Sequence, residues 1–168
     1  SGTVGATIGG GGAAGFANCV TGDYSTVSGG RGNATHGDFA SIGGGEGNSV
    51  ITGTYATIAG GRNNTVSGND AAIGGGWNNN AGGIHATVGG GFFNTADGGV
   101  TTISGGAMNM ASGTFATIAG GGSNTASGDS TTIGGGGGNT ASGEGATIGG
   151  GGENTASGVF ATISGGST

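Results

Sequence analysis

A fifteen-residue repeat, written about eleven times along 168 residues, constrains this chain more than any other feature. The repeat follows the pattern G-x-x-A-T-I-x-G-G-x-x-N-T-A-S, and its most regular copies are 113–127, 128–142 and 143–157. A fixed short period is typical of chains in which each unit packs only on its two neighbours. We therefore expect an elongated molecule whose function lies on a repeated surface.

One apolar position sets the register of the repeat. From Ile58 onward this anchor recurs every fifteen residues; the interval before it is sixteen, and the first interval is nineteen because residues 12–17 are expanded by four. The anchors are Ile8, Val27, Ile42, Ile58, Ile73, Val88, Ile103, Ile118, Ile133, Ile148 and Ile163. We expect this column to form the core of the molecule.

The residues before each anchor alternate in polarity. Two positions earlier stands Ala or another small residue, and Thr stands between the two in most copies. The regular part of this Thr column is Thr57, Thr87, Thr102, Thr117, Thr132, Thr147 and Thr162. A small residue inside, Thr outside and Ile inside is the period-two pattern of a short strand. The pattern predicts an outward column of hydroxyl and methyl groups.

Two further columns predict corners. A Gly-Gly pair follows the anchor in every copy, as at Gly90-Gly91, which indicates a positive φ or a backbone packed too closely to admit a Cβ atom. An Asn column follows, from Asn18 to Asn154, and Asn both tolerates the left-handed region and hydrogen-bonds nearby backbone. A second short segment then directs a small residue such as Ala96 inward.

Two short strands and two corners per repeat describe one coil of a parallel β-solenoid, or β-roll. We expect an all-β fold in which residues 1–168 form a single domain, a rod about 50 Å long at a coil spacing of about 4.8 Å. The 51 glycines exclude helix, and the absence of Pro and of Gly at every third position excludes collagen. A flexible linker needs no register, so the strict columns argue against it.

The predicted core is thin, and thin cores rarely stabilise a chain alone, so we expect the rod to associate with copies of itself. One more column supports this expectation, because the residue before the small position is aromatic in half of the copies. Alternation places it outside the coil, on the Thr face. Its aromatic members are Tyr24, Phe39, Tyr55, Phe115 and Phe160. The column predicts an interface or binding face, with a scatter of surface apolar residues as the alternative.

Charge and composition restrict the partners. The formal net charge is −6 with two Arg and no Lys, so we expect no nucleic-acid partner. No apolar run is long enough for a membrane span. Richness in Gly, Ser, Thr and Asn fits an extracellular or cell-surface location. Cys19 is the single cysteine, and we interpret it as a small filler of the first coil in preference to an interchain bridge.

No catalytic or cofactor-binding constellation stands out, and we expect neither an enzyme nor a metal site. His36 and His85 occupy different repeat positions without a matched acidic or nucleophilic partner. The eight acids are scattered over several repeat positions and form no column. A calcium-binding roll would have a nonapeptide with Asp, where this chain has Asn. Residues 33–35 (N-A-T) and 63–65 (N-N-T) are glycosylation sequons.

The segment 56–68, A-T-I-A-G-G-R-N-N-T-V-S-G, resembles the head repeats of trimeric autotransporter adhesins, and so do 116–128 and 146–158. Those heads carry blocks such as S-V-A-I-G and T-V-A-G-G-x-N-N at a similar period. The resemblance covers essentially the whole chain. It implies a left-handed parallel β-roll, usually trimeric, displayed outside a bacterial cell for adhesion to a host surface or a carbohydrate. Similar repeats occur in phage and other surface fibres.

From these observations we expect a non-enzymatic structural or adhesive fibre subunit. The alternative is an ice-binding or crystal-surface-binding module, in which the stacked Thr column presents a regular array of hydroxyl and methyl groups. A glycoside-cleaving enzyme is disfavoured, because the chain lacks the paired carboxylates that this chemistry usually needs.

The ends of the chain carry no polar cap, which predicts end-to-end association. If Thr168 of one copy leads into Ser1 of another, five residues after Ile163 and eight up to Ile8 place these anchors thirteen apart, close to the internal fifteen. A head-to-tail contact of this kind does not close and generates a filament. The alternatives are a closed trimer and a rod that continues in further chain.

Overall fold

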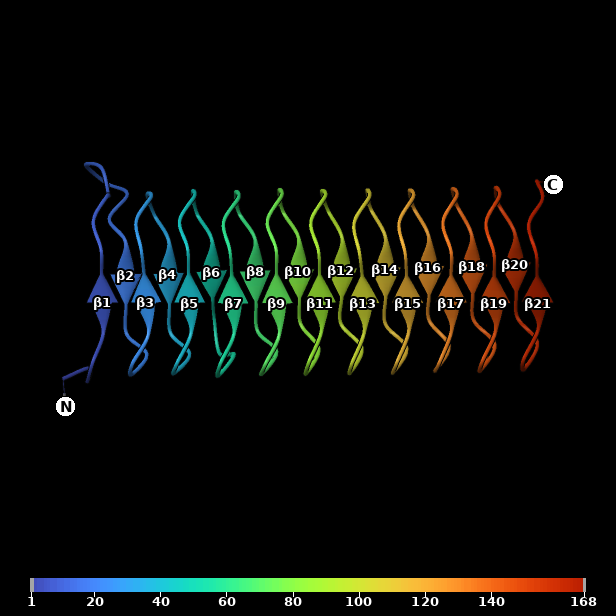
Figure 1. The fold of residues 1–168 in the computed structure, drawn as a ribbon, viewed down its shortest axis with the longest axis horizontal. Helices are drawn as coiled ribbons and strands as arrows, with labels where there is room; N and C mark the ends of the chain where they lie inside the picture. Colours follow the sequence, from blue (N-terminus) through green and yellow to red (C-terminus); the bar gives the residue numbers. More distant parts are fainter. Residues whose placement is uncertain (1, 168) are drawn as a thin grey trace.

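Residues 2–167 of the computed structural model form one straight stack of coils, and every strand in it is two residues long (Figure 1). The described residues contain no helix. The strands are β1 Thr7–Ile8, β2 Cys19–Val20, β3 Thr26–Val27, β4 Ala34–Thr35, β5 Ser41–Ile42, β6 Ser49–Val50, β7 Thr57–Ile58, β8 Thr65–Val66, β9 Ala72–Ile73, β10 Asn80–Ala81, β11 Thr87–Val88, β12 Thr95–Ala96, β13 Thr102–Ile103, β14 Met110–Ala111, β15 Thr117–Ile118, β16 Thr125–Ala126, β17 Thr132–Ile133, β18 Thr140–Ala141, β19 Thr147–Ile148, β20 Thr155–Ala156 and β21 Thr162–Ile163.

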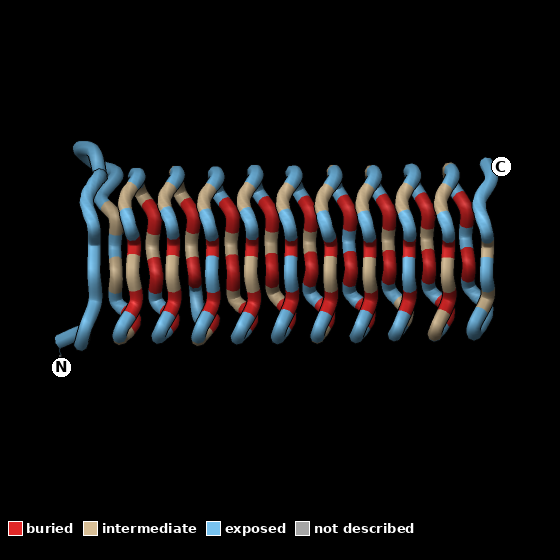
Figure 2. Tube along the Cα trace, in the orientation of Figure 1, coloured by how far each residue is buried: buried red, intermediate tan, exposed pale blue. Residues whose placement is uncertain are grey.

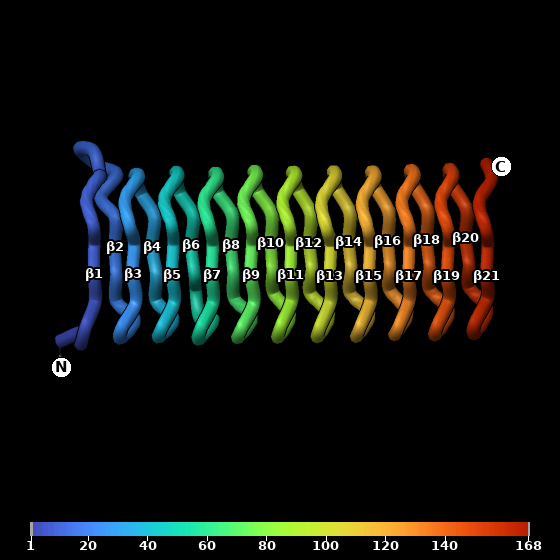
Figure 3. Tube along the Cα trace, viewed as in Figure 1, coloured from blue at the N-terminus to red at the C-terminus, as the bar shows by residue number. Residues whose placement is uncertain are grey.

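The strands form two parallel sheets. The odd-numbered strands make one sheet of eleven, and the even-numbered strands make one of ten. Equivalent residues pair from coil to coil, as Thr87 does with Thr102 and Val88 with Ile103. The chain therefore advances one coil at a time from one end of the rod to the other (Figure 3). The structure confirms the predicted all-β parallel solenoid with two short strands per coil.

The buried residues of the core recur at matching places in successive coils of both sheets (Figure 2). Every anchor from Val27 to Ile148 is at most 1% exposed, and the facing residues of the even sheet, such as Val66 and Ala96, are equally buried. The outermost anchors differ, since Ile8 is 49% exposed. One neighbouring coil covers Ile8, whereas two cover each inner anchor.

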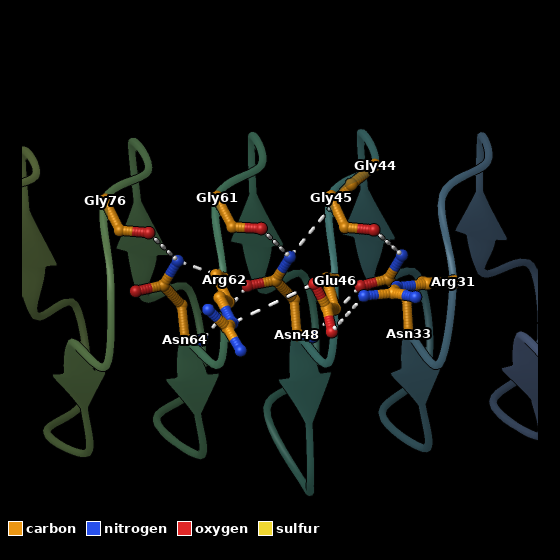
Figure 4. Close-up of polar contacts among 10 residues, drawn as sticks. All are labelled: Arg31, Asn33, Gly44, Gly45, Glu46, Asn48, Gly61, Arg62, Asn64 and Gly76. Atoms are coloured by element: carbon orange, nitrogen blue, oxygen red, sulfur yellow. Dashed lines mark hydrogen bonds and ion pairs between the residues drawn. The ribbon is translucent and has the colours of Figure 1, made fainter. Parts of the chain in front are cut away.

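The Asn column forms a hydrogen-bond ladder inside the corner that follows each odd-numbered strand (Figure 4). Asn48 Oδ1 accepts a bond of 3.0 Å from the backbone N–H of Asn64. Asn48 Nδ2 donates to the carbonyl oxygens of Gly44 and Gly61, at 3.0 and 2.9 Å. Since these Asn side chains are buried, the ladder replaces the hydrogen bonds that water would make.

The Asn column lies at a corner, as predicted, but its members do not themselves adopt the left-handed conformation that Asn tolerates. Positive φ falls on the residue just before it, for example 53° at Asn63 and 58° at Asn78. The left-handed residue turns the chain at this corner. The Asn side chain that follows must then point inward, because it bonds carbonyl oxygens of two coils. The predicted hydrogen bonding of the column to backbone is correct.

Glycine is required at one member of each Gly-Gly pair in the regular coils. Gly61 has φ +90°, and a Cβ atom there would collide with the carbonyl oxygen of Gly76 in the next coil. Gly60 has no atom within 4 Å of the same added group. A further glycine column, represented by Gly68 against Gly83 O, is equally crowded at the opposite corner. Both predicted reasons for glycine, positive φ and close approach, therefore apply at Gly61.

The two departures from the fifteen-residue period are absorbed at corners. In the first coil the four extra residues form a small antiparallel hairpin, in which Phe16 N–H donates to Ala13 O at 2.8 Å. The single extra residue lies after β6, and the pairing of Ser49 with Thr65 is undisturbed. The expected join between copies involves Ser1 and Thr168, which lie outside the described residues.

Candidate binding surfaces

The molecule offers surfaces, not a cavity. No pocket opens in residues 2–167, and within that range no group of three or more His, Cys, Asp or Glu side chains is arranged to hold a metal ion. No helix in the described chain is long and apolar enough to cross a membrane. We call the edge where an even strand leads to the next odd strand the turn edge, and the opposite edge the glycine edge (Figure 1).

The aromatic column predicted from the sequence lies on the turn edge. Its members adopt the left-handed conformation, with φ of 56° at Tyr24 and Phe39 and 57° at Tyr55. The expectation that alternation would place the column on the Thr face is therefore wrong, because these residues belong to the turn and not to the extended strand. They are exposed, as are Phe115 and Phe160.

Three members of the column form a continuous stack. The ring centroids of Tyr24 and Phe39 are 5.2 Å apart with an interplanar angle of 11°, and those of Phe39 and Tyr55 are 4.9 Å apart at 16°. Because inner ring faces cover one another, the stack presents mainly ring edges and the Tyr hydroxyls to solvent. Phe115 and Phe160 do not join it, since Asp70 and several further residues intervene in the column.

A second aromatic cluster on the glycine edge was missed by the sequence analysis. Trp77 and Phe93 meet edge to face at 4.9 Å, and Phe92 and Phe93 do so at 6.2 Å. Met108 in the next coil is 57% exposed. We call Trp77, Phe92, Phe93 and Met108 the Trp77 patch. The available signal was a run of large apolar residues between Gly-Gly and Asn in successive repeats, where other repeats have small or charged residues.

Charged residues occupy the three coils before Trp77 along the glycine edge. Figure 4 shows these residues, Arg31, Glu46 and Arg62. Arg31 contacts Glu46 at 2.8 Å, and Arg62 approaches the same carboxylate at 3.8 Å. The Arg31 guanidinium also lies 5.6 Å from the centre of the Phe16 ring. Both Arg side chains are largely exposed and Glu46 is half-buried, so each ion pair contributes about 0–1 kcal/mol. Their main effect is to place charged groups at the N-terminal end of the Trp77 patch.

Hydroxyl groups line both sheet faces, whereas the repeat pattern predicted an outward Thr column on the odd sheet alone. In that sheet the column is exposed or half-buried throughout: Thr57, Thr87, Thr102, Thr117, Thr132, Thr147 and Thr162. The even sheet carries a second outward Thr column at Thr65, Thr95, Thr125, Thr140 and Thr155. Beside it, two residues further along each coil, lie Ser112, Ser127, Ser142 and Ser157. The even sheet thus bears two adjacent hydroxyl columns over its last coils.

The eight acids are exposed or half-buried, and the prediction of their distribution needs one correction. Asp23 and Asp38 occupy consecutive places in one column, and Asp38 Oδ1 accepts a bond of 2.8 Å from the Asp23 N–H, so the acids are less scattered than predicted. His36, His85 and Cys19 lie at the surface.

The Asn side chains of the two glycosylation sequons differ in their exposure to solvent. The Asn33 side chain is buried, and its Nδ2 atom donates to the carbonyl oxygens of Gly29 and Gly45. Asn63 is exposed. Only Asn63 could carry a glycan in this fold.

The geometry defines a parallel β-solenoid repeat protein. No protein-family model matches the chain, and the search of curated proteins gave no significant match. The functional conclusion therefore depends on the surfaces just described.

Proposed function

We propose that this chain is a non-enzymatic subunit of an extracellular structural or adhesive fibre, self-associating end to end or as a trimer. The observation that carries the proposal is the uninterrupted stack of coils with rows of large apolar side chains exposed along its edges. Exposed apolar rows on a rigid scaffold are characteristic of interaction surfaces. The expected ligand of such a fibre is a host surface or a carbohydrate, bound by repeated outward columns.

The outermost strands support end-to-end growth. Within the described chain, β1 pairs only with β3, and β21 pairs only with β19. A strand edge of N–H and carbonyl groups is a template for further parallel pairing of the kind that already joins the coils. A coil of similar sequence, in a second copy or in further chain, can extend the rod by the same pairing. The resemblance to adhesin head repeats supports the trimer instead, because those heads are usually trimeric.

Microscopy and sedimentation of the purified chain test the proposal. We expect rods longer than one chain, or a closed trimer, in negatively stained images, and a sedimentation coefficient above that of the monomer. A monomer that persists over the whole accessible concentration range would contradict self-association. Binding to immobilised host extracts and glycans tests the adhesive role separately.

A second candidate is a module that binds ice or another crystalline surface, and the two hydroxyl columns of the even sheet favour it. Neighbouring coils repeat at about 4.8 Å, and alternate residues of a strand lie about 7 Å apart, so these side chains form a regular planar grid. Thermal hysteresis and ice-crystal shape are the measurements. We expect Thr140→Tyr to abolish any such activity, and Thr132→Tyr on the opposite face to leave it unchanged. Absence of hysteresis in the native chain would reject this candidate.

A further inference from the structure

The two aromatic rows lie on opposite edges of the rod, in different coils, and are equally long. The stack of Tyr24, Phe39 and Tyr55 occupies three successive coils of the turn edge. The Trp77 patch occupies three successive coils of the glycine edge. With coils about 4.8 Å apart, each row is about 10 Å long between its outer coils. Two copies of the chain can therefore bring one row against the other.

The residues that continue each row determine the orientation. Beyond Tyr55 the turn edge continues with Asp70 and then His85, both exposed. Before Trp77 the glycine edge has Arg62 and, one coil earlier, Glu46. Toward the C-terminus, the turn edge therefore presents apolar, acidic and imidazole groups in that order. Toward the N-terminus, the glycine edge presents apolar, basic and acidic groups in that order.

When two copies lie antiparallel, every group in the turn-edge row of one copy faces a complementary group in the glycine-edge row of the other. This alignment sets Tyr24 opposite Met108, Phe39 opposite Phe92 and Phe93, and Tyr55 opposite Trp77. In the same register Asp70 faces Arg62, and His85 faces Glu46. A parallel alignment of the same apolar rows instead sets Asp70 against Ser123, where no opposite charge is present. Charge complementarity therefore selects the antiparallel register.

We propose that the occupant of the Trp77 patch is the Tyr24–Phe39–Tyr55 stack of a second, antiparallel copy of this chain. The inference rests on the proposed self-association but adds a lateral contact that uses neither end of the rod. Ring edges and the methionine side chain exclude water at the centre, and the Asp70–Arg62 pair and the His85–Glu46 contact lie at one end. Asp23 and Asp38 lie beside this contact, and each accepts a hydrogen bond from a backbone amide of its own chain.

The contact is heterologous, since the turn edge of one copy meets the glycine edge of the next. Each copy keeps its other edge free, so the association does not close and produces a flat array of antiparallel rods. The edge is narrow, and a single contact falls in the small, weak class of interfaces. Repetition across an array strengthens it, because several contacts then form together.

Disulfide trapping tests the register directly. Both variants are made in the 168-residue chain with Cys19→Ser, so that no other cysteine is present. One carries Asn69→Cys, beside Asp70, and the other carries Asn63→Cys, beside Arg62. Mixing these two variants under mild oxidation should give a cross-linked dimer. The matched control pairs Asn69→Cys with Ser123→Cys, the contact of the parallel register; both Asn63 and Ser123 are exposed and left-handed, with φ of 53° and 56°. Preferential trapping of the control pair would overturn the antiparallel assignment, as would no trapping of either pair.

Charge reversal gives an independent readout. We expect Asp70→Arg and Arg62→Asp each to weaken lateral association by about tenfold in sedimentation, and a mixture or double variant to recover it. Unfolding midpoints close to that of the native chain show that the variants fold. If oligomers persist unchanged in both single variants and in Trp77→Ser, association proceeds through the ends or a trimer. That result overturns the lateral inference while leaving the proposed function standing; a strict monomer overturns both.

Discussion

The side chain of Asn79 links two coils by accepting a 3.0 Å hydrogen bond at Oδ1 from the backbone N–H of Asn94. Asn94 repeats the relationship with Asn109 in the coil beyond, also at 3.0 Å. Each Asn therefore stabilises its own corner and positions the next. Because these groups are buried, loss of one member leaves donors and acceptors that water cannot easily reach.

The first prediction concerns this ladder. Asn94→Ala removes the partner of the Asn109 N–H and of the Gly90 carbonyl, and one of the two donors to the Gly106 carbonyl. We expect the free energy of unfolding to fall by about 2–4 kcal/mol in denaturant titrations. Asn80→Ala is the control, because its amide bonds an exposed carboxylate, and it should cost about 1 kcal/mol or less. Equal losses would show that the ladder adds nothing to stability.

Adjacent glycines provide a second test. Gly106 has φ +91°, and an added Cβ would collide with Gly121 O, whereas Gly105 has no atom within 4 Å of such a group. We expect Gly106→Ala to lower the unfolding free energy by more than about 2 kcal/mol, since strain and a backbone clash combine. Gly105→Ala should be neutral or stabilising by about 0.5 kcal/mol through the unfolded state. Thermal melts of the pair distinguish the two outcomes.

The prediction that Ile faces the core and Thr faces outward in the odd sheet is tested at strand β15. Ile118 is fully buried, and its neighbour Thr117 faces outward. Ile118→Asp places an unpaired charge in the core, and we expect destabilisation of more than about 4 kcal/mol or failure to form the rod. Thr117→Ser and Thr117→Val should change stability by about 0.5 kcal/mol. Circular dichroism during heating is sufficient, and an unaltered melting curve for Ile118→Asp would contradict the assignment.

One buried hydroxyl is expected to destabilise the native chain. Thr35 points into the core between Val20 and Val50 of the neighbouring coils, and its Oγ1 atom has no hydrogen-bond partner. Thr35→Val keeps the shape and removes the unsatisfied group, so we expect stabilisation by about 1–2 kcal/mol. Thr35→Ser, which keeps the hydroxyl and loses a methyl group, should be less stable than the native chain. The opposite ranking would exclude this explanation.

The left-handed corner predicts another stabilising change. Val100 has φ +57°, a conformation that is strained for a β-branched residue, and its side chain is 45% exposed. Asn accepts the left-handed region readily, so Val100→Asn should raise the unfolding free energy by about 1 kcal/mol. Val100→Ala, whose methyl group cannot hydrogen-bond nearby backbone as an Asn amide does, should gain less. A lower melting temperature for Val100→Asn would indicate that the exposed valine makes a stabilising contact.

Part of the candidate surface could be predicted from the sequence. Tyr24, Phe39 and Tyr55 recur at one repeat position, so their column was visible, but their stacking and their position on the turn edge were not. The Trp77 patch combines adjacent repeat positions in a few copies only. A search for identical columns passes over such a cluster, because no single column contains it.

The sequence by itself determined the period, the inward column from Val27 to Ile148 and therefore the parallel solenoid, because an alternating strand and Gly-rich corners repeated at one length allow few other ways to bury the same residues. Only the tertiary structure decided which residue turns the chain at each corner, and that Asn79 bonds Asn94. It also decided the order of groups along each edge. These features depend on contacts between coils, and such contacts arise only when stacking brings residues a full repeat apart to within hydrogen-bonding distance.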